Sequence, residues 1–75
     1  MKEQIVDLSE GIPGAVVAMT ELAKTQRDAP ALLAVLEARD IRGSDVWVAY
    51  KDECGKDADA FADYLREKAP AQGEL

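Results

Sequence analysis

The stretch DADAFADYL, residues 57–65, carries the clearest helical pattern of the 75-residue chain. Its apolar residues recur at the i, i+3, i+4 and i+7 spacing that places side chains on one face of an amphipathic helix. Asp57 is a residue type that caps free N–H groups at a helix start, and Pro70 is one that ends a helix. The pattern predicts a helix from residue 57 to just before Pro70, with an apolar face formed by Ala58, Phe61, Ala62 and Leu65.

The segment GIPG, residues 11–14, predicts the start of another helix. Proline suits the first helical turn, because the N–H that it lacks has no partner there. Apolar residues then recur at helical spacing up to a predicted end near residue 25 or 26. We expect the buried stripe of this helix to consist of Ile12, Val16, Met19 and Ala23.

Two further helices are predicted in the centre of the chain. Asp28 is expected to cap the first of them, which ends near residue 39 or 40. Gly43 and Ser44 form the turn, and Ser44 is expected to cap a helix that continues to Gly55. The run VWVAY, residues 46–50, also has strand propensity, which leaves a strand as the alternative there.

These signals predict an all-α fold, a compact bundle of four short helices. Residues 28–55 have the length of a helix-turn-helix-like central pair. Residues 11–69 would form a single helical domain, and residues 70–75 a frayed tail. The N-terminal segment, residues 1–10, is expected to be an arm, with a short strand or an extra helical turn as alternatives. The predicted core is Ile12, Val16, Met19, Leu22, Leu32, Val35, Leu36, Ile41, Trp47, Tyr50, Phe61 and Leu65.

Composition narrows the class of protein. A chain of this length buries only about 60% of its unfolded surface, so self-association as a homodimer is left open. The net charge of −6 opposes phosphate binding, so nucleic acid is not the expected partner. The lone Cys54 favours a reducing compartment, and residues 1–10 do not read as a signal peptide. The longest apolar run, residues 15–19, is too short for a membrane span. We expect a cytoplasmic protein.

Catalysis is not expected. The chain has no histidine, the commonest general base, and Cys54 has no histidine to activate it. The acids around Gly55 lack the calcium-loop spacing, and one cysteine cannot form a zinc cluster. We predict no catalytic residue, no metal site and no cofactor.

Two surface regions are candidate partner-binding sites. In the first, two arginines flank a turn whose backbone N–H groups could hold an anion, and two aromatic residues follow it. In the second, acids lie four residues apart on one helix, and repulsion between like charges at that spacing destabilises a helix by a few tenths of a kcal/mol. Such a locally unfavourable pattern suggests a surface that binds a basic partner. The first region is Arg39, Arg42, Gly43, Ser44, Trp47 and Tyr50; the second, the acidic stripe, is Asp52, Glu53, Asp59 and Asp63.

Residues 7–15 (DLSEGIPGA) and 41–52 (IRGSDVWVAYKD) together resemble small uncharacterised proteins of bacteriophages, prophages and other mobile elements. In that family such motifs are followed by Cys-Gly and an acidic-apolar helix, as at residues 54–65 here. The resemblance implies a phage or mobile-element origin, and it carries no catalytic residue.

Three functions remain open from the sequence. The main hypothesis is a non-enzymatic, small acidic protein–protein interaction module that binds a host or phage protein. The first alternative is a helix-turn-helix-like nucleic-acid-binding regulator. The second is a small-anion or nucleotide-binding module that uses Arg39, Arg42 and Ser44.

Overall fold

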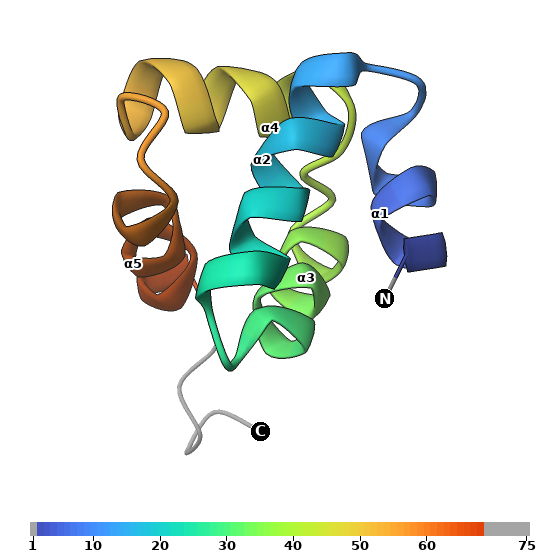
Figure 1. The fold of residues 1–75 in the computed structure, drawn as a ribbon. Helices are drawn as coiled ribbons and strands as arrows, with labels where there is room; N and C mark the ends of the chain where they lie inside the picture. Colours follow the sequence, from blue (N-terminus) through green and yellow to red (C-terminus); the bar gives the residue numbers. More distant parts are fainter. Residues whose placement is uncertain (1, 69–75) are drawn as a thin grey trace.

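The computed structural model describes residues 2–68, and all regular secondary structure in that range is helical (Figure 1). The all-α class is confirmed, but the structure has five α-helices where four were predicted. The elements are α1 (Lys2–Ser9), α2 (Pro13–Thr25), α3 (Ala29–Ala38), α4 (Ser44–Val48), the π-helical segment η1 (Ala49–Glu53) and α5 (Ala58–Lys68).

The additional helix is α1, in the segment predicted as an N-terminal arm. Leu8 and Ser9 are each only 2% exposed, because α1 packs against α2 and α3. The Ser9 hydroxyl donates a hydrogen bond to the carbonyl oxygen of Val6 at 2.8 Å, which satisfies this buried polar group inside the helix. The predicted tail, residues 70–75, and the expected stop at Pro70 lie outside the described residues.

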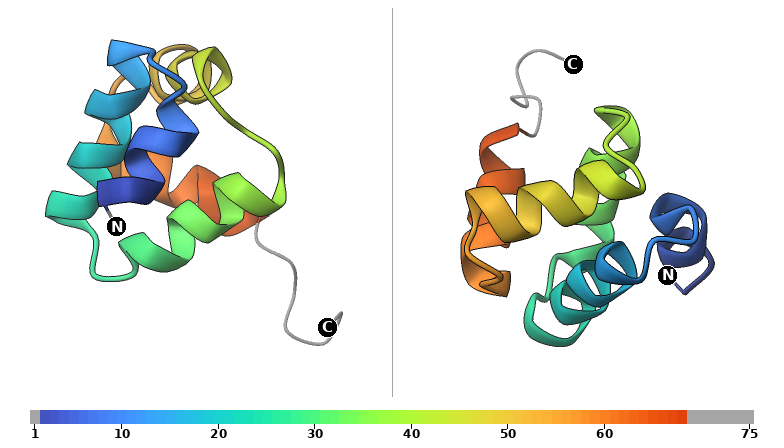
Figure 2. Two further views of the ribbon diagram at one scale, coloured as in Figure 1. Left: turned by 90° about the vertical axis from the view of Figure 1, so that its right-hand side faces the viewer. Right: turned by 90° about the horizontal axis from the view of Figure 1, so that it is seen from above.

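Helix α2 is the centre of the bundle. It packs against α1, α3, α4 and α5, while α3 and α5 also pack against each other. Figure 2 shows α4 and η1 crossing one end of the bundle, with α1 beside α2 on the opposite side from α5. A helix with neighbours on several sides needs small residues where they approach most closely, and Ala15 and Ala18 are both fully buried.

The predicted buried stripe of α2 is therefore only partly correct, since Met19 is buried as predicted and Val16 is not. Val16 was expected in the core but is 37% exposed, and the buried positions are Ala15, Ala18, Met19 and Leu22. The buried set is spaced i, i+3, i+4, i+7, whereas the predicted stripe was spaced i, i+4, i+7, i+11; the two sets share Met19, and the buried face is turned towards the alanines. The larger side chain of Val16 suggested burial, whereas close helix packing selects the alanines.

Most of the remaining predicted core is confirmed. Ile12, Ile41 and Trp47 are only half-buried, although they pack against the core. Leu33 is fully buried because α3 contacts α1, α2 and α5, which widens its buried face beyond one stripe. The confirmed positions are Met19, Leu22, Leu32, Val35, Leu36, Tyr50, Phe61 and Leu65, and the large residues that the prediction missed are Leu8, Leu33 and Val46.

The helix predicted after residue 44 is present, but it changes from α4 to the π-helical segment η1 at Ala49. Its N-cap is Gly43, with φ of 55°, and no side chain caps it, so the role predicted for Ser44 is wrong. Gly55, at φ of 60°, follows the end of η1, and the Lys56 N–H donates to the Tyr50 carbonyl at 2.8 Å. Helix α4 packs against α2, and it does not pack closely against α3 as a helix-turn-helix requires.

No helix within residues 2–68 combines the length and the apolar character that crossing a bilayer would need.

Candidate functional site

A polar network joins α5 to the turn between α2 and α3. The Arg66 guanidinium donates to both carboxylate oxygens of Asp28, at 2.8 and 3.1 Å, and to Asp63 at 2.9 Å. It also donates to the amide oxygen of Gln26 at 2.9 Å, and the Gln26 amide nitrogen donates to Asp59 at 2.7 Å. Hydrogen bonding from Arg66 lowers the pKa of Asp28, and Asp28 in turn raises the pKa of Arg66.

This network corrects the role predicted for Asp28. Its carboxylate makes no capping hydrogen bond to α3 and binds Arg66 instead. Asp57, by contrast, caps α5 as predicted, since its carboxylate accepts the N–H of Asp59 at 2.9 Å. A residue type that favours an N-cap can therefore be used for tertiary contact when a cation lies within reach.

The predicted acidic stripe is divided between two environments. Asp59 and Asp63 on α5 are held by Gln26 and Arg66 in the network above. Asp52 and Glu53 are exposed on η1, and Asp52 lies 3.8 Å from the ammonium of Lys51. Across residues 2–68, no three acid or cysteine side chains approach closely enough to hold a metal ion. The structure does not present these four acids as one unpaired negative face.

Three N–H groups in and after the turn predicted to hold an anion are engaged inside the protein. The Gly43 N–H donates to the Leu8 carbonyl at 2.6 Å, and the N–H groups of Asp45 and Val46 donate to carbonyls of the same turn. The Arg42 guanidinium pairs with Asp40 at 2.8 Å. The cavity that Arg39 lines contains neither Arg42 nor Ser44, so the predicted three-residue anion site is not assembled.

The aromatic residues form a chain through the structure. Tyr50 lies between Trp47, at a centroid distance of 6.3 Å, and Phe61, at 5.4 Å in an edge-on arrangement. Tyr50 is only 5% exposed, and burial raises its pKa. Trp47 is half-buried, with the ammonium groups of Lys51 and Lys56 at 5.7 and 5.5 Å from its ring. Tyr50 is thus a core residue, unavailable as the interface anchor considered from the sequence.

Cys54 has the environment of an inert thiol. It is 8% exposed and packs in the core, and burial raises its pKa. A raised pKa leaves less thiolate at neutral pH, and the thiolate is the reactive form. The thiol is therefore expected to react slowly as a nucleophile.

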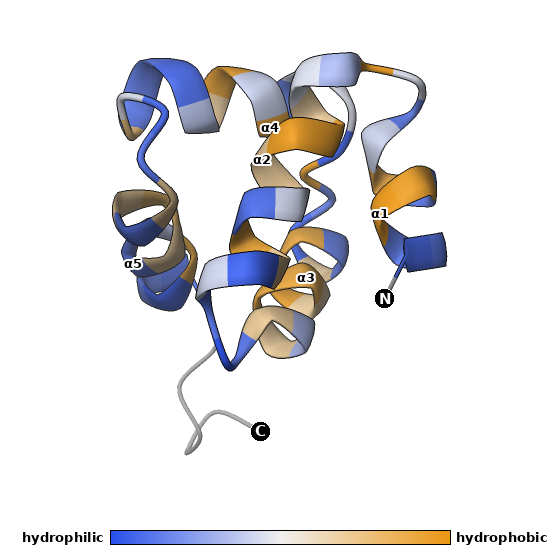
Figure 3. Cartoon of the chain, viewed as in Figure 1, coloured by the Kyte–Doolittle hydropathy of each residue, from blue (hydrophilic) through white to orange (hydrophobic). Residues whose placement is uncertain are grey.

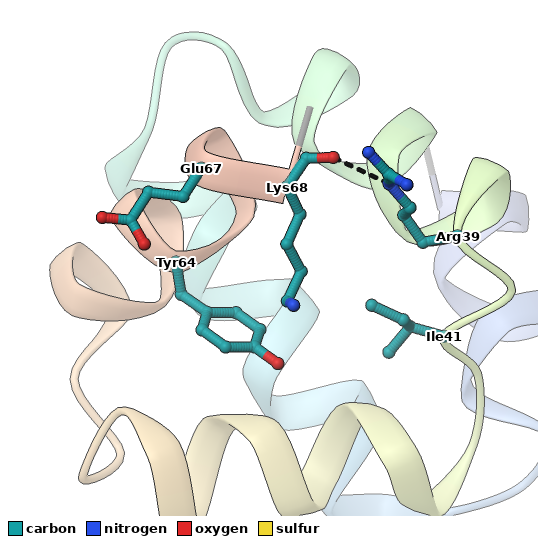
Figure 4. Close-up of a pocket in the computed structure, with 5 residues that line it drawn as sticks. All are labelled: Arg39, Ile41, Tyr64, Glu67 and Lys68. Atoms are coloured by element: carbon teal, nitrogen blue, oxygen red, sulfur yellow. Dashed lines mark hydrogen bonds between the residues drawn. The ribbon is translucent and has the colours of Figure 1, made fainter. Parts of the chain in front are cut away.

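One cavity of about 590 Å³ lies between the C-terminal ends of α3 and α5 (Figure 4). In Figure 4 the side chains of Ile41, Tyr64 and Lys68 extend towards one space, with Arg39 at its edge. The Arg39 Nε donates to the Lys68 carbonyl at 2.8 Å, and the Lys68 ammonium lies 4.7 Å from the centre of the Tyr64 ring. Of its lining residues, Arg39 was predicted from the sequence as a partner-binding candidate and Ile41 as a core residue. We call it the Arg39 cavity: Arg39, Ile41, Tyr64, Glu67 and Lys68.

A second hollow, of about 430 Å³, runs between α1 and α2. Its lining is mostly apolar, and Figure 3 shows hydrophobic segments in the middle of α1 and near the start of α2. Val6 is 59% exposed and Val16 is 37% exposed, so two branched apolar side chains border it in contact with water. We call it the α1–α2 groove, lined by Lys2, Ile5, Val6, Val16, Thr20 and Ala23.

Sequence reasoning missed the α1–α2 groove because it placed Val16 in the core and left residues 1–10 unassigned. A helical pattern was available there, since Ile5 and Leu8 lie three residues apart and would share one face of a helix. The structure does bury Leu8 in α1. With Leu8 directed inward, Val6 would have been placed about 160° away, towards solvent.

Comparison of the whole chain with protein-family models, with curated proteins and with solved structures finds no match in any of the three.

Proposed function

We propose that this chain is a non-enzymatic protein-interaction module whose docking surface is the α1–α2 groove. The observation that carries the proposal is the exposure of Val6 and Val16 at the border of an apolar hollow. Contiguous exposed apolar surface commonly marks a place where a partner binds, whereas a single exposed valine needs no explanation. A partner that covers the groove would remove both side chains from water.

The charges beside the groove favour a partner with basic residues around an apolar face. A neighbouring hollow of about 340 Å³ is lined by Lys2, Glu3, Val6 and Asp7, so two acids lie beside the groove, against Lys2, which lines both hollows. The chain as a whole carries a net charge of −6. A basic partner would be attracted to this surface, whereas a second copy would bring the same acids together.

The partner that suits this chemistry is an amphipathic segment of another protein, with lysine or arginine flanking its apolar side. Helix-in-groove binding has this form, with apolar anchors in the hollow and charges at the rim. The resemblance to small proteins of mobile elements makes a cytoplasmic host or phage protein the expected partner. Neither catalysis nor a cofactor is part of the proposal.

Paired variants test the docking surface. Tagged wild-type protein is used to capture partners from a lysate of the cells that naturally make it, alongside Val6→Asp and Val16→Asp. Val17→Asp is the matched control, because Val17 is 51% exposed on the same helix and does not line the groove. Circular dichroism confirms that each variant is folded.

We expect one protein to be captured by the wild type and by Val17→Asp and to be lost with both groove variants. Equal capture of the partner by all four proteins would contradict the proposed surface. Loss of the partner with Val17→Asp to the same extent as with the two groove variants would also contradict it. Analytical ultracentrifugation of the purified chain tests the competing occupant, since a dimer broken by Val6→Asp would assign the groove to a second copy.

A further inference from the structure

We propose that the Arg39 cavity binds a small organic anion, one that carries a carboxylate or phosphate group on an apolar body. The cavity lies between the ends of α3 and α5, and it shares no lining residue with the α1–α2 groove. This site is independent of the proposed protein partner.

The positive charge of the cavity comes from Arg39 at its edge and from Lys68, whose side chain extends into it (Figure 4). Arg39 follows α3 and Lys68 ends α5, and the Arg39 Nε donates to the Lys68 carbonyl at 2.8 Å. This bond uses the Nε of the guanidinium and holds its orientation. The two terminal nitrogens of Arg39 make no hydrogen bond within residues 2–68, so they can form the paired donors that carboxylates and phosphates accept.

Lys68 and Arg39 also lie at helix C-termini, where cations are stabilised by the helix dipole. The helix dipole therefore accounts for the presence of cationic residues at these two positions. It does not account for the direction of the Lys68 side chain, which lies over the Tyr64 ring at 4.7 Å and extends into the cavity (Figure 4). Neither cation forms an ion pair with an acid of the described chain, although Glu67 also lines the cavity.

The volume of the cavity and the apolar surface of Ile41 and Tyr64 favour an organic anion over a bare inorganic one. A volume of about 590 Å³ lies in the range of small-molecule pockets, roughly 300–1,000 Å³. Ile41 and Tyr64 supply apolar and aromatic surface beside the two cations. A phosphate ion would leave this surface uncovered, whereas an aryl or alkyl acid would cover it and gain burial of its apolar part.

The test uses four probes on the ¹⁵N-labelled full chain, at constant ionic strength set with sodium chloride. Benzoate and phenyl phosphate carry the two acid groups on one aromatic body. Inorganic phosphate carries the head group alone, and benzyl alcohol carries the body without the acid. Chemical shifts are followed at the backbone amides of Ile41 and Tyr64 and at the Arg39 side chain.

We expect saturable shifts at these positions with benzoate or phenyl phosphate, and the stronger of the two identifies the preferred acid. Inorganic phosphate and benzyl alcohol should each bind at least about tenfold more weakly, since one charged contact or one buried ring is worth roughly 1.4 kcal/mol or more. Arg39→Gln and Lys68→Gln should each weaken the organic anion at least about tenfold. Arg42→Gln is the matched control and should change nothing, because Arg42 pairs with Asp40 outside the cavity.

Absence of saturable shifts at tens of millimolar for both organic anions would overturn the proposal. Shifts that persist unchanged in Arg39→Gln and Lys68→Gln would also overturn it, because they would show binding elsewhere. Equal affinity for benzyl alcohol and benzoate would reduce the cavity to an apolar site and refute the role of the two cations.

Discussion

The indole ring of Trp47 lies on the bare Cα of Gly14, in the space that a Cβ would occupy at any other residue. A Cβ built at Gly14 would overlap three atoms of the ring, Cγ, Cδ2 and Cε3. This contact brings α4 close to the first turn of α2, and it explains a glycine in a helix, where it costs up to about 1 kcal/mol relative to alanine. Trp47, the single tryptophan of the chain, is half-buried at this contact.

Gly14→Ala should lower the free energy of unfolding by about 1–2 kcal/mol, because the cost of overpacking exceeds the gain in helix propensity. Urea denaturation followed by tryptophan fluorescence measures the change. In a Trp47→Ala background, followed by circular dichroism, the same substitution should become neutral or stabilising. An equal loss in both backgrounds would show that the ring is not what excludes a side chain at Gly14.

Leu33 and Val16 should respond in opposite ways to truncation. Leu33 is fully buried, so Leu33→Ala should cost about 2–5 kcal/mol of unfolding free energy. Val16 is 37% exposed, so Val16→Ala should cost less than about 1 kcal/mol. Chemical denaturation of the two variants side by side measures the difference. If Val16→Ala were the more damaging, the register of α2 described above would be incorrect.

The pair between Asp28 and Arg66 should stabilise the fold in a pH-dependent way. The pKa of Asp28 is lowered from 3.8 in the folded chain, chiefly by hydrogen bonding from Arg66. The unfolded chain then binds more protons in acid, so this stabilisation is complete above pH 3.8 and is lost as the pH falls through the lowered folded pKa.

Thermal unfolding of wild type and Asp28→Asn from neutral to strongly acidic pH tests this assignment. The difference in Tm should be largest near neutrality and should shrink in acid. Asp45→Asn is the control, because Asp45 is exposed and its carboxylate accepts no hydrogen bond within residues 2–68. A Tm difference for Asp28→Asn that stays constant with pH would exclude a contribution from its ionised form.

Cys54 should react slowly with thiol reagents in the folded protein. It is 8% exposed and burial raises its pKa, so both access and thiolate fraction are reduced. We expect labelling by a disulfide reagent at neutral pH to be at least about tenfold slower in buffer than in concentrated urea. Comparable rates in the two solvents would mean that the thiol is accessible in the native state.

Local signals predicted the elements that depend on local interactions. The α5 helix follows from its own periodicity, and Asp57 caps it through an N–H two residues away. The register of α2 depends on four neighbouring helices, and nothing within its own sequence shows that Ala15 rather than Val16 faces them. Asp28 likewise binds Arg66, 38 residues along the chain, in place of the nearby backbone.

The candidate sites were predictable only in part, for the same reason. Arg39 was selected from its neighbourhood in the sequence, but Tyr64 and Lys68 join it through the packing of α3 against α5. The α1–α2 groove exists because Val16 faces solvent and not the core, and the register of α2 decides which of the two it faces. Residue type identified candidates, whereas tertiary packing decided which of them share a cavity.

Site-specific photocrosslinking in the cells that make this chain tests the central claim most directly. Benzoylphenylalanine replaces Val6 in one protein and Val48 in another, since Val48 is 45% exposed on α4 and lies outside the groove. We predict one discrete adduct with another protein from position 6 and none of that mass from position 48. An adduct from position 48 alone, or no adduct from position 6 when the protein is folded and abundant, would contradict the assignment of the α1–α2 groove as the docking surface.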